Sequence, residues 1–152
     1  MDNKDTIAAV NRLIETSKDG EYGFTSAAEH LRRADLRQLF SSRADECRRA
    51  ANELQALVIE LGGKAEDSGT AAGAMHRGWV AVKSKLAGYT DLAILEEAER
   101  GEDIALARYR DALEEEVLPL SVRMVIQRQY EGVKYNHAQV RAVRDQERAV
   151  KA

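Results

Sequence analysis

Apolar residues recur along this chain at intervals of three and four, the spacing of an amphipathic α-helix, over four long stretches. We predict helices over about 3–33, 35–61 and 91–116, and a fourth from 119 nearly to the end. Gly62 follows the second stretch, where a glycine readily ends a helix, and Pro119 suits the first turn of the fourth because its φ is already fixed. These elements predict an all-α protein.

The first predicted helix has to pass Gly20 and Gly23, which are poor helix formers. The apolar stripe keeps its phase across both glycines, whereas a true break normally resets the phase. We therefore predict one helix instead of two. Asp35 is predicted to cap the second helix, with Gln38 as its capping-box partner. The connection is then short, so the first two helices should be antiparallel neighbours.

The stretch from 63 to about 90 differs from the rest, because it holds five of the ten glycines. Within it Met75, Trp79, Val82 and Leu86 fall at helical spacing, which predicts a short amphipathic helix lying across the bundle. Two helices, a long crossover and two more helices form the arrangement of ferritin-like bundles. We therefore predict a single ferritin-like four-helix bundle domain over residues 1–152, with a crossover containing a short helix between the second and third long helices.

Each long helix carries, near its middle, a side chain that can bind a metal in or beside its apolar stripe. The first stripe places Glu21 at a core position, and the fourth places His137 between Val133 and Val140. A buried charge is costly unless it is paired or bound to a metal, so this coincidence in four helices predicts a polar centre inside the bundle. The candidate metal ligands are Glu99, Glu102, His137, Glu46 and Glu21.

Carboxylates with an imidazole favour iron or manganese over zinc, since no thiolate cluster accompanies them. Di-metal sites in ferritin-like bundles also use a Glu-x-x-His pair on each of two helices. This sequence contains no such pair, because Glu46 is followed at that offset by Arg49 and Glu131 by Lys134. The sequence thus argues against a standard di-iron centre and leaves open a site for one or two divalent metal ions.

The alternative is a buried ion network without metal. Arg43 lies one turn before Glu46, and Arg100 and Arg108 are also available, so guanidinium groups can neutralise the carboxylates. In that case His137 is a neutral core histidine bonded to one of these carboxylates. At this point the two hypotheses are a metal-binding bundle and a metal-free structural or interaction bundle.

Composition narrows the classes of function. The 152 residues include 23 Lys and Arg against 26 Asp and Glu, with the signs interleaved, which argues against a protein that coats nucleic acid. Cys47 is the single cysteine, and no stretch has the roughly 20 apolar residues of a membrane span. No phosphate loop, paired-cysteine zinc spacing or nucleophile elbow occurs, so we assign no enzyme activity. We expect a cytoplasmic protein that binds neither nucleic acid nor membrane.

The expected outer faces of the first and fourth helices are densely charged, for example at Lys4, Arg12, Arg128 and Lys134. A closed cage needs extensive apolar outer patches, which the sequence does not offer. We therefore expect a monomer or a small oligomer, with a homodimer preferred.

Several short motifs punctuated by glycine resemble those of one bacterial family. They are Asp19-Gly20 with Phe24 and Ala28-Glu29, Gly62-Gly63, Ser68-Gly69, His76-Arg77-Gly78-Trp79, Glu99-Arg100-Gly101-Glu102-Asp103, and His137. The family consists of four-helix-bundle proteins of unknown function in the ferritin-like superfamily. The resemblance implies a ferritin-like bundle without a defined activity, and it implies a polar site at the Glu99–Asp103 motif and His137. The missing Glu-x-x-His pair argues against oxidase or iron-storage activity.

Overall fold

The computed structural model describes residues 3–69, 89–115 and 118–151. Four helices make up this part of the chain: α1 (Asn3–His30), α2 (Ala34–Glu60), α4 (Asp91–Leu113) and α5 (Leu120–Lys151). The described residues form no strand, so the all-α prediction is confirmed. None of these helices is both long enough and apolar enough to cross a membrane.

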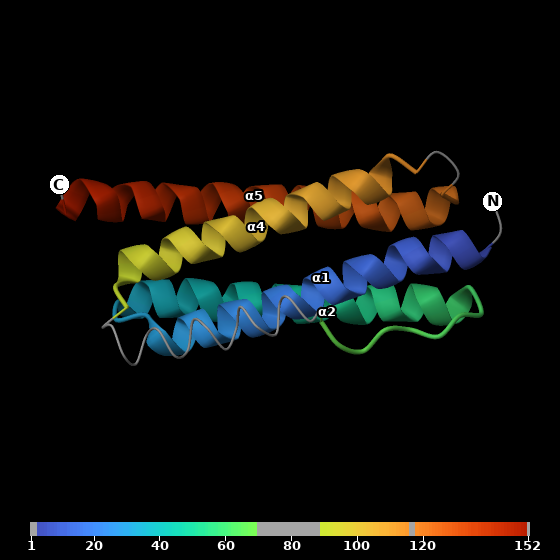
Figure 1. Cartoon of the computed structure of the whole chain (residues 1–152), viewed down its shortest axis with the longest axis horizontal. Helices are drawn as coiled ribbons and strands as arrows, with labels where there is room; N and C mark the ends of the chain where they lie inside the picture. Colours follow the sequence, from blue (N-terminus) through green and yellow to red (C-terminus); the bar gives the residue numbers. More distant parts are fainter. Residues whose placement is uncertain (1–2, 70–88, 116–117, 152) are drawn as a thin grey trace.

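The helices form two layers (Figure 1). α1 packs along α2 in one layer, α4 packs along α5 in the other, and α1 also packs on α4. α2 ends at one end of the bundle and α4 begins at the opposite end. This arrangement confirms the ferritin-like bundle. The short crossover helix predicted at Met75, Trp79, Val82 and Leu86 lies outside the described residues.

The connection between α1 and α2 is held from another helix. Arg33 is the N-cap of α2 and makes no side-chain cap, whereas Asp35 lies in the first turn, so the predicted Asp35 cap was wrong. Asp91, at the start of α4, instead accepts hydrogen bonds from the backbone N–H groups of Arg32 at 2.8 Å and Arg33 at 3.2 Å. Asp35 is drawn to the Arg33 guanidinium, 2.6 Å away, which leaves its carboxylate unavailable as a cap.

The apolar core consists of two clusters that meet at a polar layer in the middle of the bundle. One cluster includes Phe24, Phe40 and Leu95, and the other includes Ile14, Leu54 and Ile126. Between them lie buried polar side chains from all four helices: Ser17, Arg43, Glu102, Gln129 and Asn136. The polar centre predicted from the stripes is therefore present in the fold.

α1 is continuous across both of its glycines, as predicted. A Cβ atom at Gly20 would lie 2.8 Å from Cys47 Sγ of α2, closer than such atoms normally approach. Gly20 thus lets α1 and α2 come together at the level of the polar layer. Gly20, and not Glu21, faces α2 at this level. Glu21 is only half-buried, so it does not take the core position predicted for it.

We predict that Gly20→Ala lowers the free energy of unfolding by about 1 kcal/mol, because the steric cost of overpacking exceeds the gain in helix propensity. Gly23→Ala is the matched control, since a Cβ there meets no described atom within 4 Å. It should stabilise the protein by up to about 1 kcal/mol. Urea unfolding measures both. In a Cys47→Ala background, Gly20→Ala should lower the free energy of unfolding by less. If the effects of the two substitutions simply add, the proposed contact is disproved.

Candidate functional site

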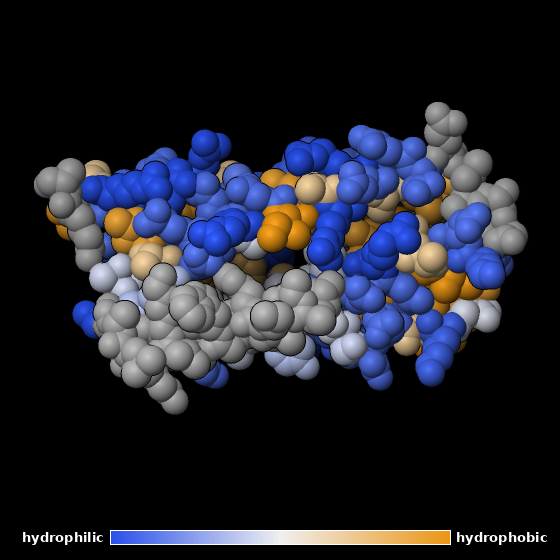
Figure 2. All heavy atoms as spheres, viewed as in Figure 1, coloured by the Kyte–Doolittle hydropathy of each residue, from blue (hydrophilic) through white to orange (hydrophobic). Residues whose placement is uncertain are grey.

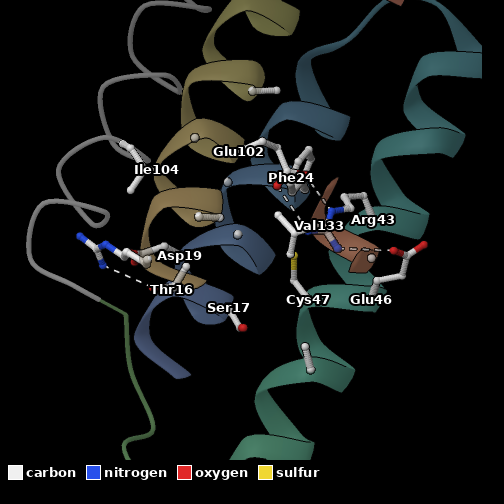
Figure 3. A pocket seen from close by; sticks show the side chains of 18 of the residues that line it. Thr16, Ser17, Asp19, Phe24, Arg43, Glu46, Cys47, Glu102, Ile104 and Val133 are labelled. Atoms are coloured by element: carbon white, nitrogen blue, oxygen red, sulfur yellow. Dashed lines mark hydrogen bonds and ion pairs between the residues drawn. The ribbon is translucent and has the colours of Figure 1, made fainter. Parts of the chain in front are cut away.

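An ion pair between Arg43 of α2 and Glu102 of α4 lies at the centre of the bundle. Arg43 Nε donates to Glu102 Oε1 at 2.9 Å, and a second guanidinium nitrogen lies 3.4 Å from Oε2. Arg43 is 8 % exposed and Glu102 is 2 % exposed. Glu46 lies 3.4 Å from the same guanidinium and accepts a hydrogen bond of 2.8 Å from Asn136 of α5. Figure 3 shows Arg43 reaching between Glu102 and Glu46.

Burial and charge fix the protonation states around this pair. Burial alone lowers the pKa of Arg43, but the neighbouring carboxylates of Glu102 and Glu46 oppose it; the pKa is raised and the guanidinium stays charged. Burial raises the pKa of the Cys47 thiol to about 12, although Arg43 opposes the change. The thiol is therefore neutral near pH 7, and the low-pKa thiolate of a reactive cysteine is absent from this position.

A second chain of hydrogen bonds crosses the bundle near the first. The Ser17 hydroxyl of α1 lies 3.5 Å from the Tyr109 hydroxyl of α4, which donates to Gln129 of α5 at 2.7 Å. Gln129 in turn donates to Glu53 of α2 at 2.7 Å. Burial raises the pKa of Tyr109 to about 12, so its hydroxyl remains a donor. No buried side-chain nitrogen or oxygen among the described residues lacks a partner.

A cluster of possible ligands lies between α4 and α5, away from the central pair. Glu99 and Asp103 are one turn apart on α4, and His137 faces them from α5. One ligand atom from each lies within 4.8 Å of the other two, and His137 Nε2 is 2.6 Å from Asp103 Oδ1. The side chains of Glu99 and His137 are 14 % and 16 % exposed, whereas Asp103 is 60 % exposed. Arg144 of α5 donates to both oxygens of Glu99.

The candidate ligands predicted from the sequence thus divide into three groups. Glu99 and His137 come together between α4 and α5, while Glu46 and Glu102 share Arg43. Glu21 stands apart from both pairs, and its carboxylate lies 3.7 Å from Lys18 Nζ.

Residues 5–115 match the family described as a domain of unknown function (DUF2383). The chain belongs to this family. The match ends before α5, so His137 and Arg144 lie beyond the part of the chain that it covers.

Two solved structures show what the fold of this DUF2383 protein is similar to. A mutant of Dps1 from Mycobacterium smegmatis superposes with a TM-score of 0.75 at 15 % identity, covering 92 % of this chain and 95 % of that one. A dodecameric thioferritin, the bacterioferritin-related protein from Bacteroides fragilis, gives 0.77 at 16 % identity, covering 99 % and 91 %. At these identities the likeness shows a shared fold. A comparison with curated proteins gives no match.

The two sites of this DUF2383 protein differ in how well they suit a metal ion. At the centre, the permanent charge of Arg43 already neutralises Glu102, and a dication beside it would be repelled. Between α4 and α5, two carboxylates and an imidazole offer the oxygen and nitrogen donors that iron and manganese accept. The guanidinium of Arg144 is ion-paired with Glu99 there, but it also lies 2.8 Å from Asp145 and so has a second acidic partner.

Four residues important to these sites were missed by the stripe analysis, namely Asp103, Gln129, Asn136 and Arg144. In α5 the predicted stripe places His137 between Val133 and Val140, whereas the buried polar positions are Gln129 and Asn136. The spacing of Gln129, Val133 and Asn136 would have revealed this face, because it alternates four and three residues. Gln129 and Asn136 are buried although they are polar, because each has a hydrogen-bond partner in another helix.

We predict that Glu102→Leu destabilises the protein by about 3–5 kcal/mol, because it leaves the charge of Arg43 buried with only Glu46 nearby. Arg43→Met combined with Glu102→Leu should recover most of this loss, since the pair is then replaced as a whole. Urea unfolding gives both values.

The exposed pair Asp45 and Arg48, 3.2 Å apart, provides the control. Asp45→Ala should cost less than about 1 kcal/mol. A double variant of Arg43 and Glu102 as unstable as Glu102→Leu alone would show that the two residues do not act as a unit.

Proposed function

We propose that this ferritin-like protein binds one divalent metal ion, iron or manganese, through Glu99, Asp103 and His137. The observation that carries the proposal is the distance between the ligand atoms, all within 4.8 Å of one another. Ligands this close need only small side-chain movements to converge on one ion. Among the described residues this is the one group of three acidic, histidine or cysteine side chains with such proximity.

The donor set supports iron or manganese. Carboxylate oxygens and a histidine nitrogen suit these metals, and Cys47, the single thiol, is buried elsewhere in the core. The ferritin-like fold adds support, since metal sites in such bundles are built from carboxylates and histidines on facing helices. Glu99 and Asp103 on α4, facing His137 on α5, follow the same principle with a different spacing.

Arg144 is the natural competitor of the metal at this site. Its guanidinium and a divalent cation would both be drawn to the Glu99 carboxylate, so metal binding has to release Arg144. Asp145 can retain the released guanidinium, because it already contacts Arg144 at 2.8 Å. The affinity for metal should therefore depend on residue 144 as well as on the three ligands.

A second candidate function is a metal-free structural or interaction bundle. The Arg43–Glu102 pair favours it, because the centre is neutralised without an ion. The two candidates differ at one place only, the cluster between α4 and α5. Metal binding at that cluster distinguishes them.

We predict that protein freed of metal binds one Mn²⁺ per chain, and that His137→Ala weakens this binding at least tenfold because a ligand is lost. Arg144→Met should strengthen binding, because it removes the competing cation. Titration calorimetry gives the stoichiometry and affinity.

His30→Ala is the matched control, because His30 bonds the backbone oxygen of Ser26 and lies in α1. It should leave Mn²⁺ binding unchanged. An absence of Mn²⁺ binding, or equal affinities for the wild type and His137→Ala, would leave the metal-free bundle as the function.

The homodimer expected from the sequence is also a proposal. Figure 2 shows a mainly hydrophilic face with apolar side chains in small, separate patches, which supports a small assembly over a closed shell. On α5, Leu120, Met124 and Tyr135 are more than half exposed and are available for a limited contact. Light scattering should give a monomer or dimer, whereas a particle of about twelve subunits, a closed symmetric assembly, would contradict this.

A further inference from the structure

A cavity of about 620 Å³ lies within the bundle and is bounded by all four described helices. Along α4 its lining extends from Ile94 to Tyr109, which corresponds to roughly 22 Å at the rise of an α-helix. The cavity is therefore elongated along the bundle. Its volume falls in the range of pockets that hold small organic ligands, about 300–1,000 Å³.

Most of the surface that lines this cavity is apolar, although charged and polar side chains from all four helices also border it. Phe24, Ile94, Ile104 and Val133 belong to the apolar part. Figure 3 shows side chains from several helices around the space, among them Ser17 and Cys47. Glu99, Asp103 and His137 are absent from the lining, so the cavity is separate from the proposed metal site.

All four glycines within the described helices line this cavity: Gly20, Gly23, Gly101 and Gly132. Glycine is less favourable than alanine inside a helix, so each position calls for a physical reason. Cys47 supplies the reason at Gly20. At the other three, a Cβ atom would meet no described atom within 4 Å. Gly23 is half-buried, and Gly101 and Gly132 are exposed, so these three glycines leave open the part of the lining that faces solvent.

Arg108 gives the cavity a positive charge available to a ligand. The half-buried Arg108 donates one long hydrogen bond, 3.4 Å, to Thr16 Oγ1, and no carboxylate of the described residues pairs with it. The sequence from 70 to 88 contains no aspartate or glutamate that could serve as its partner.

The other arginines of the lining differ from Arg108 in their surroundings. Three of them are ion-paired, as Arg43 with Glu102, Arg100 with Glu97 and Arg128 with Glu53. The remaining one, Arg49, is exposed to solvent. Arg108 is thus the half-buried guanidinium of the lining whose charge is not already matched by a described carboxylate.

We propose that the cavity binds an elongated, mainly apolar molecule with a single carboxylate at one end, and that Arg108 binds this carboxylate. The apolar walls receive the body of the molecule, since burial of apolar surface is the main favourable contribution. A guanidinium is well suited to the acidic end, because it can donate two hydrogen bonds to one carboxylate. A cationic molecule of the same shape would meet repulsion from Arg108.

Decanoate and decylamine are matched probes for this proposal, since they share a chain length and differ in charge. In titration calorimetry at pH 7 with chelator present, we expect one decanoate per chain and at least tenfold weaker binding of decylamine. Arg108→Met should weaken decanoate binding at least tenfold. Arg110→Met, an exposed arginine of the same helix outside the lining, should leave it unchanged.

A second pair of variants tests the location. Gly132→Leu places a side chain at the cavity wall and should weaken decanoate binding at least tenfold, whereas Ala138→Leu, exposed on the same helix outside the lining, should not. Both substitutions introduce leucine, which is a good helix former, so folding should be kept. The proposal is overturned if decanoate does not bind, if decylamine binds equally well, or if Gly132→Leu has no effect. The chelator separates these outcomes from the metal proposal.

Discussion

The ion pair between Arg43 and Glu102 is the interaction on which the middle of this bundle depends. It joins α2 to α4, which are not packed directly on one another, and it separates the two apolar clusters of the core. Leaving either charge buried alone would cost several kcal/mol. A shift of α4 along α2 that kept apolar residues inside would still break this pair. Asn136 extends the constraint to α5 through Glu46, so the pair helps to fix the relative heights of three helices.

The same pair also argues against the bundle centre as the place of the proposed metal ion. Glu102 has the residue type and position of a bundle-centre ligand, yet it is held by a guanidinium that keeps its charge at any ordinary pH. If Arg43 released Glu102, its guanidinium would remain buried with Glu46 as its remaining acidic partner. Arg144 is in a different position, because Asp145 can accept it when Glu99 is taken by another cation. The metal site that we propose therefore lies at the outer cluster, where Arg144 has a second acidic partner.

The sequence predicted the helices and the presence of a polar centre well, because both follow from periodicity. The phase of the α1 stripe across Gly20 was sufficient to predict one continuous helix. The partners within the polar centre were harder to predict, since a rotation of one residue changes which side chain points inward. This is why His137 was placed in the core while Asn136, its neighbour, is the buried residue. Arg33 and Asp91 show a further limit: Asp91 closes the α1–α2 connection from 58 residues away, which no local capping pattern can reveal.

The cavity lies beside this polar centre, since Arg43 and Glu102 belong to its lining. A long arginine side chain that crosses between non-adjacent helices keeps them apart, and apolar side chains cannot fill the space beside it without isolating its charge. Gly101 and Gly132 also belong to the lining and are exposed, so they leave it open toward solvent. A ferritin-like bundle can thus keep its fold at about 15 % identity to its structural neighbours, because the fold does not fix the polar residues at its centre. The fold depends on the apolar stripes, and the chemistry depends on the few polar residues placed among them.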